Sequence, residues 1–529
     1  MAQHLFSQVP KAEIQRSRFD RSHNYKTTFD SGKLIPCYVD EALPGDTFNM
    51  KMSGFARLAT PIHPIMDNLY METFFFAVPM RLVWENWEKF NGAQDTPSAS
   101  TDFTIPQQVA PGGGFSEGTQ PDYMGVPVDV PGISISMLPF RAYNLIWNEW
   151  FRDENLQSSV TTPIDDATST SVNLRSRGKR HDYFTSCLPW PAKDNGNPVT
   201  LPLGTSAPVI GIGNDSTMTW ETGTLNPNES TGEAADPAYT TFKGIGDLNA
   251  SGGQEIWINS DGDGYPAIYA DLTDATASTI NEIRQAFQIQ RLQERDARGG
   301  TRYTEIIKAH FGVTSPDARL QRPEFLGGGG TMININPVQQ TTPTGIVPDV
   351  TPQGNLAAYG TASWSGHGFT KSFTEHCIII GMVSVRADLT YQSGINKMWL
   401  RKSRYDFYWP ALSHIGEQVV ENQEIYAQGT SEDTETFGYQ ERYAEYRYKP
   451  SLITGRFRSS YPESLDAWHL SQDFGSLPVL GDTFIQDTPP VDRIVAVPSE
   501  PQFLFDAYFN LNCARPMPLY GVPGFVDHF

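Results

Sequence analysis

Several short motifs in this 529-residue sequence have residue types and spacings that could support catalysis. GFSEG, at residues 114–118, has the spacing of a serine nucleophile elbow. That elbow needs a strand, a sharp turn and a helix, whereas this motif lies between PGGG and TQPDYMGVP, which predict a loop. GIG, at residues 211–213, lacks the third glycine of a dinucleotide-binding fingerprint. We therefore predict no catalytic residues and do not expect an enzyme.

One acidic turn has part of a calcium-binding pattern. The segment NSDGDG places Asn259, Asp261 and Asp263 at positions one, three and five of a calcium loop. Position twelve, where such a loop needs a bidentate glutamate, is Ala270. We interpret the segment as an acidic turn and keep the three residues as a secondary calcium hypothesis. The sequence has no HExxH, Walker or Cys/His zinc pattern, so we predict no cofactor.

Lysine and arginine gather at two places in a chain whose formal net charge is −21. An acidic surface repels phosphate, so contact with nucleic acid would need a local basic patch or a separate basic partner. A run of basic residues is usually a solvated loop or is paired with nearby carboxylates. The alternative here is a phosphate contact, with neighbouring aromatic rings stacking on bases. The two clusters consist of Arg16, Arg18 and Arg21, and of Arg175, Arg177, Lys179 and Arg180.

Aromatic side chains are concentrated in LPFRAYNLIWNEWFRDENLQ, residues 138–157. Proline suits the first turn of a helix because its missing N–H costs nothing there, and the apolar residues recur at helical spacing. We predict a helix with one aromatic face, and packing in the core is the simpler interpretation of that face. The alternative is packing against a neighbouring subunit, because aromatic rings and arginine dominate interface centres. The residues concerned are Tyr143, Trp147, Trp150 and Phe151.

The rest of the sequence predicts a protein built mainly from short strands. Glycine (45) and proline (39) are spread along the chain, which favours many turns over a helical bundle. The apolar runs LYMETFFFAVP and CIIIGMVSV predict strands, and both are too short to span a bilayer. Helices are expected in MRLVWENWEKFNG, TINEIRQAFQIQRLQERDA and TRYTEIIKAHFG. Residues 195–277 are rich in Gly, Ser, Thr, Asn and acids, which predicts a polar surface insertion.

The cysteines and the N-terminal segment bear on the compartment. Cys37, Cys187, Cys377 and Cys513 are far apart and form no metal-binding pattern. A reducing compartment fits them better than a disulfide framework. The N-terminal segment lacks the apolar stretch of a signal peptide. We expect a soluble protein that is neither exported by a classical signal nor inserted into a membrane.

Five long blocks of the sequence resemble the major capsid protein of microviruses, the small single-stranded DNA phages, and most closely the gokushovirus branch. They lie in order over nearly the whole chain and are unusual enough to be specific, whereas residues 195–277 match none of them. The blocks are SRFDRSHNYKTTFDSGKLIPCYVDEALPGDTF, LPFRAYNLIWNEWFRDENLQ, RSRGKRHDYFTSCLPWPAK, RDARGGTRYTEIIKAHFGVTSPDARLQRPEFLGG and RPMPLYGVPGFVDHF.

The resemblance implies a mainly β fold: an eight-stranded antiparallel jelly roll of the viral capsid type, with long, partly helical loop insertions. Copies of such a subunit form a T=1 icosahedral shell around a circular single-stranded DNA genome. The implied segments are a basic N-terminal arm (1–26), the first jelly-roll strands with a helical insertion (27–137), the aromatic helix and basic loop (138–194), the polar insertion (195–277), a helical insertion (278–330) and the remaining strands with a C-terminal tail (331–529).

The resemblance also implies partners and a location. The partners are other copies of the chain, the packaged DNA, a small basic DNA-binding virion protein, a scaffolding protein during assembly and a host-cell receptor. The polar insertion is the expected protrusion at the threefold axes and the expected receptor contact. The two basic clusters are the expected DNA-facing inner surface. Assembly would take place in the cytoplasm of the bacterial host, and the mature protein would belong to the virion.

A second interpretation is a large β-sandwich carbohydrate-binding protein or glycosidase. Carboxylates are numerous, and the sequence singles out no close acidic pair. An exported enzyme should carry a signal segment, which the sequence lacks. A third interpretation, a host-attachment protein without a shell function, leaves the basic clusters unexplained.

Overall fold

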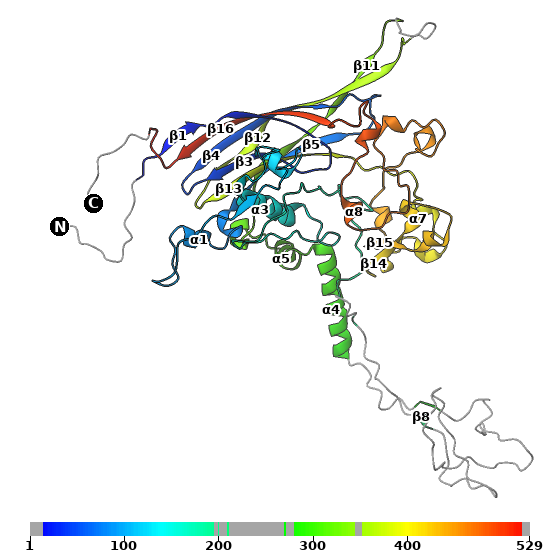
Figure 1. The fold of residues 1–529 in the computed structure, drawn as a ribbon. Helices are drawn as coiled ribbons and strands as arrows, with labels where there is room; N and C mark the ends of the chain where they lie inside the picture. Colours follow the sequence, from blue (N-terminus) through cyan, green and yellow to red (C-terminus); the bar gives the residue numbers. More distant parts are fainter. Residues whose placement is uncertain are drawn as a thin grey trace, which may run out of the picture. The chain divides into compact units, whose positions relative to one another are not determined.

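The structure is a computed structural model of a mainly β protein (Figure 1). Its described residues are 14–194, 280–343 and 352–520, with Val199 and the backbone of two short strands, β8 (Val209–Ile210) and β9 (Tyr269–Ala270). Antiparallel sheets and helical insertions make up these residues, as the sequence predicts.

The chain divides into two compact units. The first consists of Met1–Lys193 and Glu294–Phe529, and the second of Asp194–Gln293. The second unit contains the antiparallel ladder of β8 with β9 and most of helix α4 (Ile280–Gly299). Most of the predicted insertion at 195–277 lies outside the described residues. Asn259, Asp261 and Asp263 lie there too, so the calcium hypothesis stays a prediction.

The larger sheet of the first unit consists of six antiparallel strands: β1 (Ser17–Asp20), β2 (His23–Phe29), β4 (Thr47–Leu58), β11 (Asn334–Gln339), β12 (Leu356–Ser372) and β16 (Phe503–Arg515). Their order is β1-β16-β4-β12-β11, and β2 also pairs with β16. Segments from opposite ends of the sequence therefore lie side by side, with Ser17 opposite Arg515.

The smaller sheet consists of four antiparallel strands: β3 (Ile35–Ala42), β5 (Leu69–Pro79), β10 (Glu324–Met332) and β13 (Cys377–Ala387). Their order is β10-β5-β13-β3. The predicted strands LYMETFFFAVP and CIIIGMVSV are β5 and β13, which pair with each other along their full length. Both predictions are confirmed.

The four-stranded sheet is covered on both faces, which explains the unbroken apolar sequence of β13. Alternate side chains of a strand point to opposite faces of a sheet. Ile379 and Val383 belong to the core between the two sheets, and Ile378 and Ile380 belong to a second core with helix α3 (Leu138–Ile146). A polar residue at any of these positions would be buried without water.

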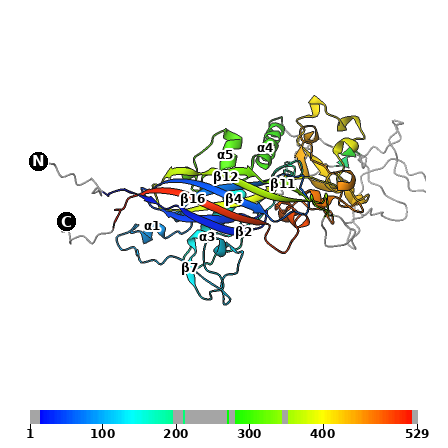
Figure 2. The same cartoon turned by 90° about the horizontal axis from the view of Figure 1, so that it is seen from above.

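Within the described residues, the six-stranded sheet, by contrast, is covered on one face only. Its strand β4 alternates, with Met50 and Met52 buried in the core and Asn49 and Lys51 exposed. This is the pattern of an antiparallel sheet with one solvated face. Figure 2 shows its strands running across the front of the molecule.

Helices and short ladders fill the connections between the strands. The predicted helix MRLVWENWEKFNG is two pieces, a 3₁₀ turn at Met80–Leu82 and α1 (Trp87–Phe90). The predicted end of TRYTEIIKAHFG is confirmed, because Gly312 follows α5 (Tyr303–Phe311) with a φ of +69°, which favours glycine. The others are α2 (Gln120–Tyr123), α6 (Asp317–Leu320), α7 (Asn422–Ile425) and α8 (Asp482–Ile485), with the ladders β6 (Gln107–Val109) to β7 (Ser134–Ser136) and β14 (Glu417–Glu421) to β15 (Thr436–Glu441).

Short helical turns complete the chain. A π-helical turn, η2 (Trp147–Phe151), continues α3. The 3₁₀ turns of the last third are Lys397–Trp399, Arg404–Asp406, Pro410–Leu412, Ser431–Thr434, Ala444–Tyr446, Gly455–Phe457, Asp466–Trp468 and Val491–Arg493. No helix in the described residues is long and apolar enough to cross a bilayer. The same residues contain no cluster of three metal-binding side chains, and the four cysteines are buried free thiols.

Replacing Phe75 by Ala should destabilise the first unit, because this ring is fully buried between the sheets. A cavity of that size costs about 3–5 kcal/mol of unfolding free energy. The matched control is Phe55→Ala, since Phe55 is 48% exposed on β4 and should cost much less. Denaturant unfolding of the full-length chain, followed by tryptophan fluorescence, measures both. Equal losses would contradict the assignment of Phe75 to the core.

Candidate functional site

The aromatic helix begins as the sequence predicts and packs inside the chain. Proline lies in the first turn of α3, and Tyr143 and Trp147 are 0% and 7% exposed. The Tyr143 hydroxyl donates to the carbonyl oxygen of Leu34 at 2.7 Å, and Nε1 of Trp147 donates to that of Ser176 at 3.0 Å. Burial raises the pKa of the Tyr143 hydroxyl. These contacts match core packing, the simpler of the two interpretations.

The next two aromatic residues of the helix are half-buried. Nε1 of Trp150 donates to the carbonyl oxygen of Pro323 at 3.0 Å, and its ring centroid lies 5.4 Å from that of Phe76. Phe151 packs edge-to-face on Phe74 at 5.3 Å. All four rings of the predicted interface thus have partners in their own chain, and their role in a subunit interface stays a prediction.

The basic cluster at residues 175–180 is organised around one carboxylate. Glu72 of β5 forms ion pairs with Arg177 and, at 2.9 Å, with Arg386 of β13. Arg180 lies 3.8 Å from the same carboxylate and 3.3 Å from Asp388. Burial pushes the pKa of Glu72 upward, but Arg177 and Arg386 together lower it below its ordinary value. Arg177 and Arg180 of this cluster are therefore paired with carboxylates of their own chain.

Two cations of this cluster are almost inaccessible. Arg177 is 8% exposed and Lys179 is 6% exposed. Burial lowers the pKa of Arg177 to about 10 and that of Lys179 to about 8, and it raises the pKa of the neighbouring Asp487 to about 7. Nε of Arg175 donates to Oδ1 of Asn144 at 3.0 Å. That these side chains face DNA stays a prediction.

The basic residues of the predicted arm belong to the six-stranded sheet or contact it. Arg18 lies in β1, and its guanidinium donates to Oδ1 of Asn512 on β16 at 2.8 and 3.0 Å. Arg16 donates to a backbone carbonyl oxygen at 2.6 Å. Arg21 donates two hydrogen bonds, of 2.6 and 3.0 Å, to the carboxylate of Asp40. Within the described residues, no hydrogen bond or ion pair joins the arm to the cluster at 175–180.

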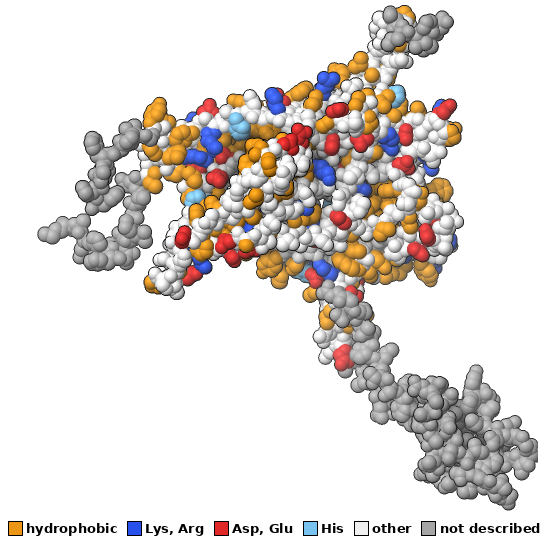
Figure 3. Space-filling view, in the orientation of Figure 1, with side chains coloured by type: hydrophobic (Ala, Val, Ile, Leu, Met, Phe, Trp, Pro, Cys, Tyr) orange, Lys and Arg blue, Asp and Glu red, His pale blue; other side chains and the backbone are white. Residues whose placement is uncertain are grey.

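A different part of the chain presents aromatic rings to solvent. Figure 3 shows hydrophobic side chains at the surface in the region that carries α7, β14 and β15. The segments concerned, 397–409 and 442–449, together contain seven lysine or arginine residues and only two carboxylates. We name this region the aromatic surface. It consists of Met398, Trp399, Tyr405, Phe407, Tyr408, Trp409, Tyr446 and Tyr448, which are 40–75% exposed.

Arginine side chains hold these rings in place without covering them. The guanidinium carbon of Arg401 lies 4.3 Å from the ring centroid of Tyr446 and 5.3 Å from that of Phe407. Arg442 donates to the carbonyl oxygen of Tyr405 at 2.9 Å. Cation–π contacts of this kind stabilise an exposed ring by about 0.5–1 kcal/mol. The two segments therefore form one continuous surface.

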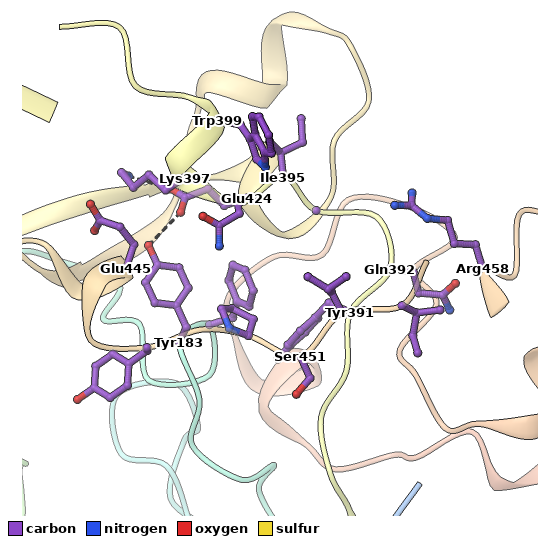
Figure 4. Close-up of a pocket in the computed structure, with 17 residues that line it drawn as sticks. Tyr183, Tyr391, Gln392, Ile395, Lys397, Trp399, Glu424, Glu445, Ser451 and Arg458 are labelled. Carbon is purple, nitrogen blue, oxygen red and sulfur yellow. Dashed lines mark hydrogen bonds and ion pairs between the residues drawn. The ribbon is translucent and has the colours of Figure 1, made fainter. Parts of the chain in front are cut away.

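A cavity of about 330 Å³ lies beside the aromatic surface (Figure 4). Trp399 and Tyr448 belong both to its lining and to the aromatic surface. In Figure 4, Tyr183 points toward Glu424, and its hydroxyl donates to Oε2 of Glu424 at 2.9 Å. Lys397 forms an ion pair of 2.9 Å with the other oxygen, Oε1. The cavity is thus aromatic with a charged wall.

A second carboxylate, Glu445, also lines the cavity. Arg401 pairs with its Oε1 at 3.4 Å, and Gln418 donates to its Oε2 at 2.6 Å. Burial raises the pKa of Glu424, although Lys397 opposes the shift. A glycosidase needs one carboxyl group as acid and the other as a nucleophile or base. Here Glu424 is paired with Lys397 and Glu445 with Arg401.

Residues 7–525 match the sequence profile of the family described as capsid protein (F protein). The chain belongs to this capsid protein family. It is 47% identical to capsid protein VP1 of Bdellovibrio phage phiMH2K, over 100% of this chain and 98% of the relative. It is 42% identical to capsid protein VP1 of Chlamydia phage 1 and 40% identical to that of Spiroplasma virus 4, in each case over 98% of this chain and 97% of the relative.

Membership of the capsid protein family confirms the resemblance to microvirus capsid proteins. It also identifies the chain as a structural protein rather than an enzyme. A capsid protein assembles with copies of itself and is part of the virion.

The sequence analysis of this capsid protein missed the aromatic surface. The segment KMWLRKSRYDFYW, residues 397–409, contains five aromatic residues and four lysine or arginine residues. That density was a readable signal, as strong as the one at residues 138–157. The segment forms only two 3₁₀ turns, so it has no helical periodicity from which one face could be predicted.

Replacing Glu72 by Gln should destabilise the capsid protein, because the buried Arg177 and the half-buried Arg386 would lose their shared charge partner. Breaking a buried pair costs about 3–5 kcal/mol, and the 21% exposure of Glu72 favours the lower end of that range. Denaturant unfolding at pH 7 measures the loss. Glu463→Gln is the matched control, since that carboxylate is 89% exposed in its pair with Arg456 and should matter far less.

The loss should depend on pH in a defined direction. Because the pKa of Glu72 is lowered in the folded state, its stabilisation is present above the ordinary glutamate pKa of 4.5 and is lost as the pH falls through the lower folded value. Wild type and Glu72→Gln should therefore converge on acidification. Equal effects of Glu72→Gln and Glu463→Gln would contradict the role of Glu72 as the centre of the cluster.

Proposed function

We propose that this chain is the major capsid subunit of a microvirus-type phage, whose copies form a T=1 icosahedral shell around a circular single-stranded DNA genome. The observation that carries the proposal is the match to three phage capsid proteins over 98–100% of this chain. A closed shell needs many copies of one subunit with self-complementary surfaces. The distribution of exposed side chains supplies candidates for those surfaces.

We infer that eight of the strands form a jelly roll of the viral capsid type. The strand orders β2-β16-β4-β12 and β10-β5-β13-β3 support this inference. In each sheet, strands from the first part of the chain alternate with strands from the last part, as the two Greek keys of a jelly roll require. On this reading β1 and β11 are edge additions, and the long connection between β5 and β10 contains the helical insertions.

We propose that the aromatic surface is buried between copies in the shell. Exposed Trp, Tyr, Phe, Met and Arg are the residue types that protein interfaces concentrate. Monomeric proteins rarely expose large contiguous apolar patches. The cavity lined by Trp399 would receive a side chain of the neighbouring copy. Trp150 and Phe151, which keep some exposed surface, would extend the contact, and Tyr143 and Trp147 would support it from the core.

The other predicted partners belong to the same proposal. The net charge of −21 calls for a small basic virion protein, or for local basic surfaces, to hold the packaged DNA. The proposed DNA-facing residues are Arg16, Arg18, Arg21, Arg175, Arg177, Lys179 and Arg180, of which Arg177 and Lys179 would have to act from buried positions. A scaffolding protein would assist assembly in the host cytoplasm. The polar insertion at 195–277 would form the threefold protrusion and contact the receptor.

Electron microscopy of the full-length chain, produced together with its neighbouring genes, tests the proposed function. Uniform closed particles of small diameter are the expected result, because every copy must occupy an equivalent position in a T=1 shell. A density map at intermediate resolution would also show whether residues 195–277 stand at the threefold axes. A persistent monomer or small oligomer, with all partners present, would overturn the proposal.

The double variant Trp399→Ala/Phe407→Ala should abolish closed particles while leaving the subunit folded, because both rings are more than half exposed. Truncating an interface hot spot typically costs 2 kcal/mol or more, about a 30-fold loss of affinity per contact. Sedimentation velocity and circular dichroism measure assembly and folding. Tyr303→Ala/Phe311→Ala, on rings 69% and 76% exposed on α5, is the matched control. Normal particles from the Trp399 variant would remove the aromatic surface from the interface.

A further inference from the structure

The outer face of the six-stranded sheet is uncovered in the described structure. No described helix of the first unit crosses its strands in the view of Figure 2. We name as the open sheet face the side chains of β1, β2, β4 and β16 that point away from the core. They are the odd-numbered residues of β4 and the even-numbered residues of the other three strands. The sequence analysis did not predict this face, because only Arg18 among its residues belongs to a predicted basic cluster.

Cations outnumber anions on the open sheet face, although the chain as a whole is strongly acidic. Its carboxylates are Asp20 and Asp506, and both are engaged. Asp20 accepts hydrogen bonds from the backbone N–H and the hydroxyl of Ser22, and Asp506 forms an ion pair with Lys26 at 2.6 Å. The cations are Arg18, Lys26, Lys51 and Arg57, and all four are exposed.

Two cations of β4 are free to meet a ligand. Lys51 and Arg57 make no ion pair with any described residue. They lie six residues apart on one strand, about 20 Å at 3.4 Å per residue. That distance matches a run of several phosphates rather than a single anion. The face therefore attracts an extended polyanion.

Aromatic and amide side chains lie between these cations. Phe55, on β4 between Lys51 and Arg57, is 48% exposed, and Tyr508 on β16 is 45% exposed. Tyr508 is opposite Asn24 of β2 in the register, and Asn510 is opposite Lys51. Exposed rings on a sheet offer stacking platforms for unpaired bases, and amide groups can bond to base edges.

We propose that the open sheet face binds single-stranded DNA, with bases stacked on Phe55 and Tyr508 and phosphates bound by Lys51 and Arg57. This inference rests on the proposed function, and it places the main DNA contact on the six-stranded sheet, because Arg177 and Lys179 of the other predicted cluster are buried. Single strands suit this face better than a duplex, because stacking on a ring needs a base that is not paired. Arg18, at the edge of the same face, joins it to the predicted arm.

Another copy of the chain is the less favoured occupant of this face. Lysine is depleted in protein interfaces, and the centres of interfaces are poor in charge. The open sheet face is instead rich in Asn, Ser and Thr around its cations. The segments of the aromatic surface also contain cations, but its eight exposed apolar and aromatic side chains are of the types that protein interfaces concentrate, as contact between copies requires. The two faces thus differ in chemistry and can be tested separately.

Fluorescence anisotropy of a labelled 20-nucleotide oligo(dT) with the full-length, unassembled chain tests the proposal. Lys51→Gln/Arg57→Gln should weaken binding by about tenfold and reduce the slope of log K against log salt by about 1.4, since each phosphate contact on a single strand contributes about 0.7. Phe55→Ala should weaken binding at least about fivefold through lost stacking. Lys402→Gln/Arg404→Gln, exposed cations of the aromatic surface, is the charge-matched control and should leave binding unchanged. A 20-base-pair duplex should bind more weakly than oligo(dT).

The outcomes separate this inference from the proposed function. Wild-type affinity and salt slope in Lys51→Gln/Arg57→Gln would overturn it, as would an equal loss in the Lys402→Gln/Arg404→Gln control. Unchanged oligo(dT) binding together with lost particles in the sheet variant would assign the face to a contact between copies. Failure of the wild-type chain to form any particles would instead count against the shell, whatever the oligonucleotide shows.

Discussion

One half-buried carboxylate, Glu72, joins segments of this subunit that are far apart in the sequence. Glu72 lies on β5, and its partner Arg386 lies on the neighbouring strand β13. Arg177 lies in a loop that is more than a hundred residues from both of them in the sequence. Each cation would be costly to bury alone, so the three groups specify one arrangement of sheet and loop. The same loop is also bound to the segment at Asp487, because the backbone N–H of Asp487 donates to the carbonyl oxygen of Arg177. The core thus gains specificity from ion pairing as well as from apolar packing.

Because the basic loop pairs with groups of its own subunit, the surfaces left for partners are the aromatic surface and the open sheet face. These two surfaces differ in the side chains that they expose. The aromatic surface exposes rings that arginines hold from the side, and such rings are energetically suited to burial against another protein. The open sheet face exposes cations and amides around two isolated rings, a composition suited to a polyanion with unpaired bases. Both surfaces carry more cations than carboxylates, whereas the chain as a whole has a net charge of −21. A shell subunit needs both kinds of contact, one to its neighbours and one to its content.

Sequence reasoning succeeded where one local pattern determines the outcome. The apolar run of β13 is a buried strand because both faces of its sheet are covered, and Gly312 ends α5 because the chain turns there through positive φ. It could not place the basic loop, since the partner of Arg177 is set by tertiary structure and Glu72 looks like any other strand carboxylate in the sequence. The aromatic surface could not be predicted from the sequence for a related reason. Phe407 and Tyr446 both contact Arg401, but nearly forty residues separate them and no periodicity connects them.

The position of β16 has a consequence for how the protein is made. This strand, residues 503–515, is inserted between β4 on one side and β1 and β2 on the other, so it hydrogen-bonds to three strands made much earlier in translation. Until those residues have left the ribosome, β4 has an open edge, and β1 lacks its one partner among the described strands. Contacts so distant in sequence close slowly, and these can form only after residues 503–515 have left the ribosome. A prematurely terminated chain would lack the strand that completes the sheet. The fold therefore acts as a check on chain length, because only a subunit translated through residue 515 can present its finished surfaces to the assembling particle.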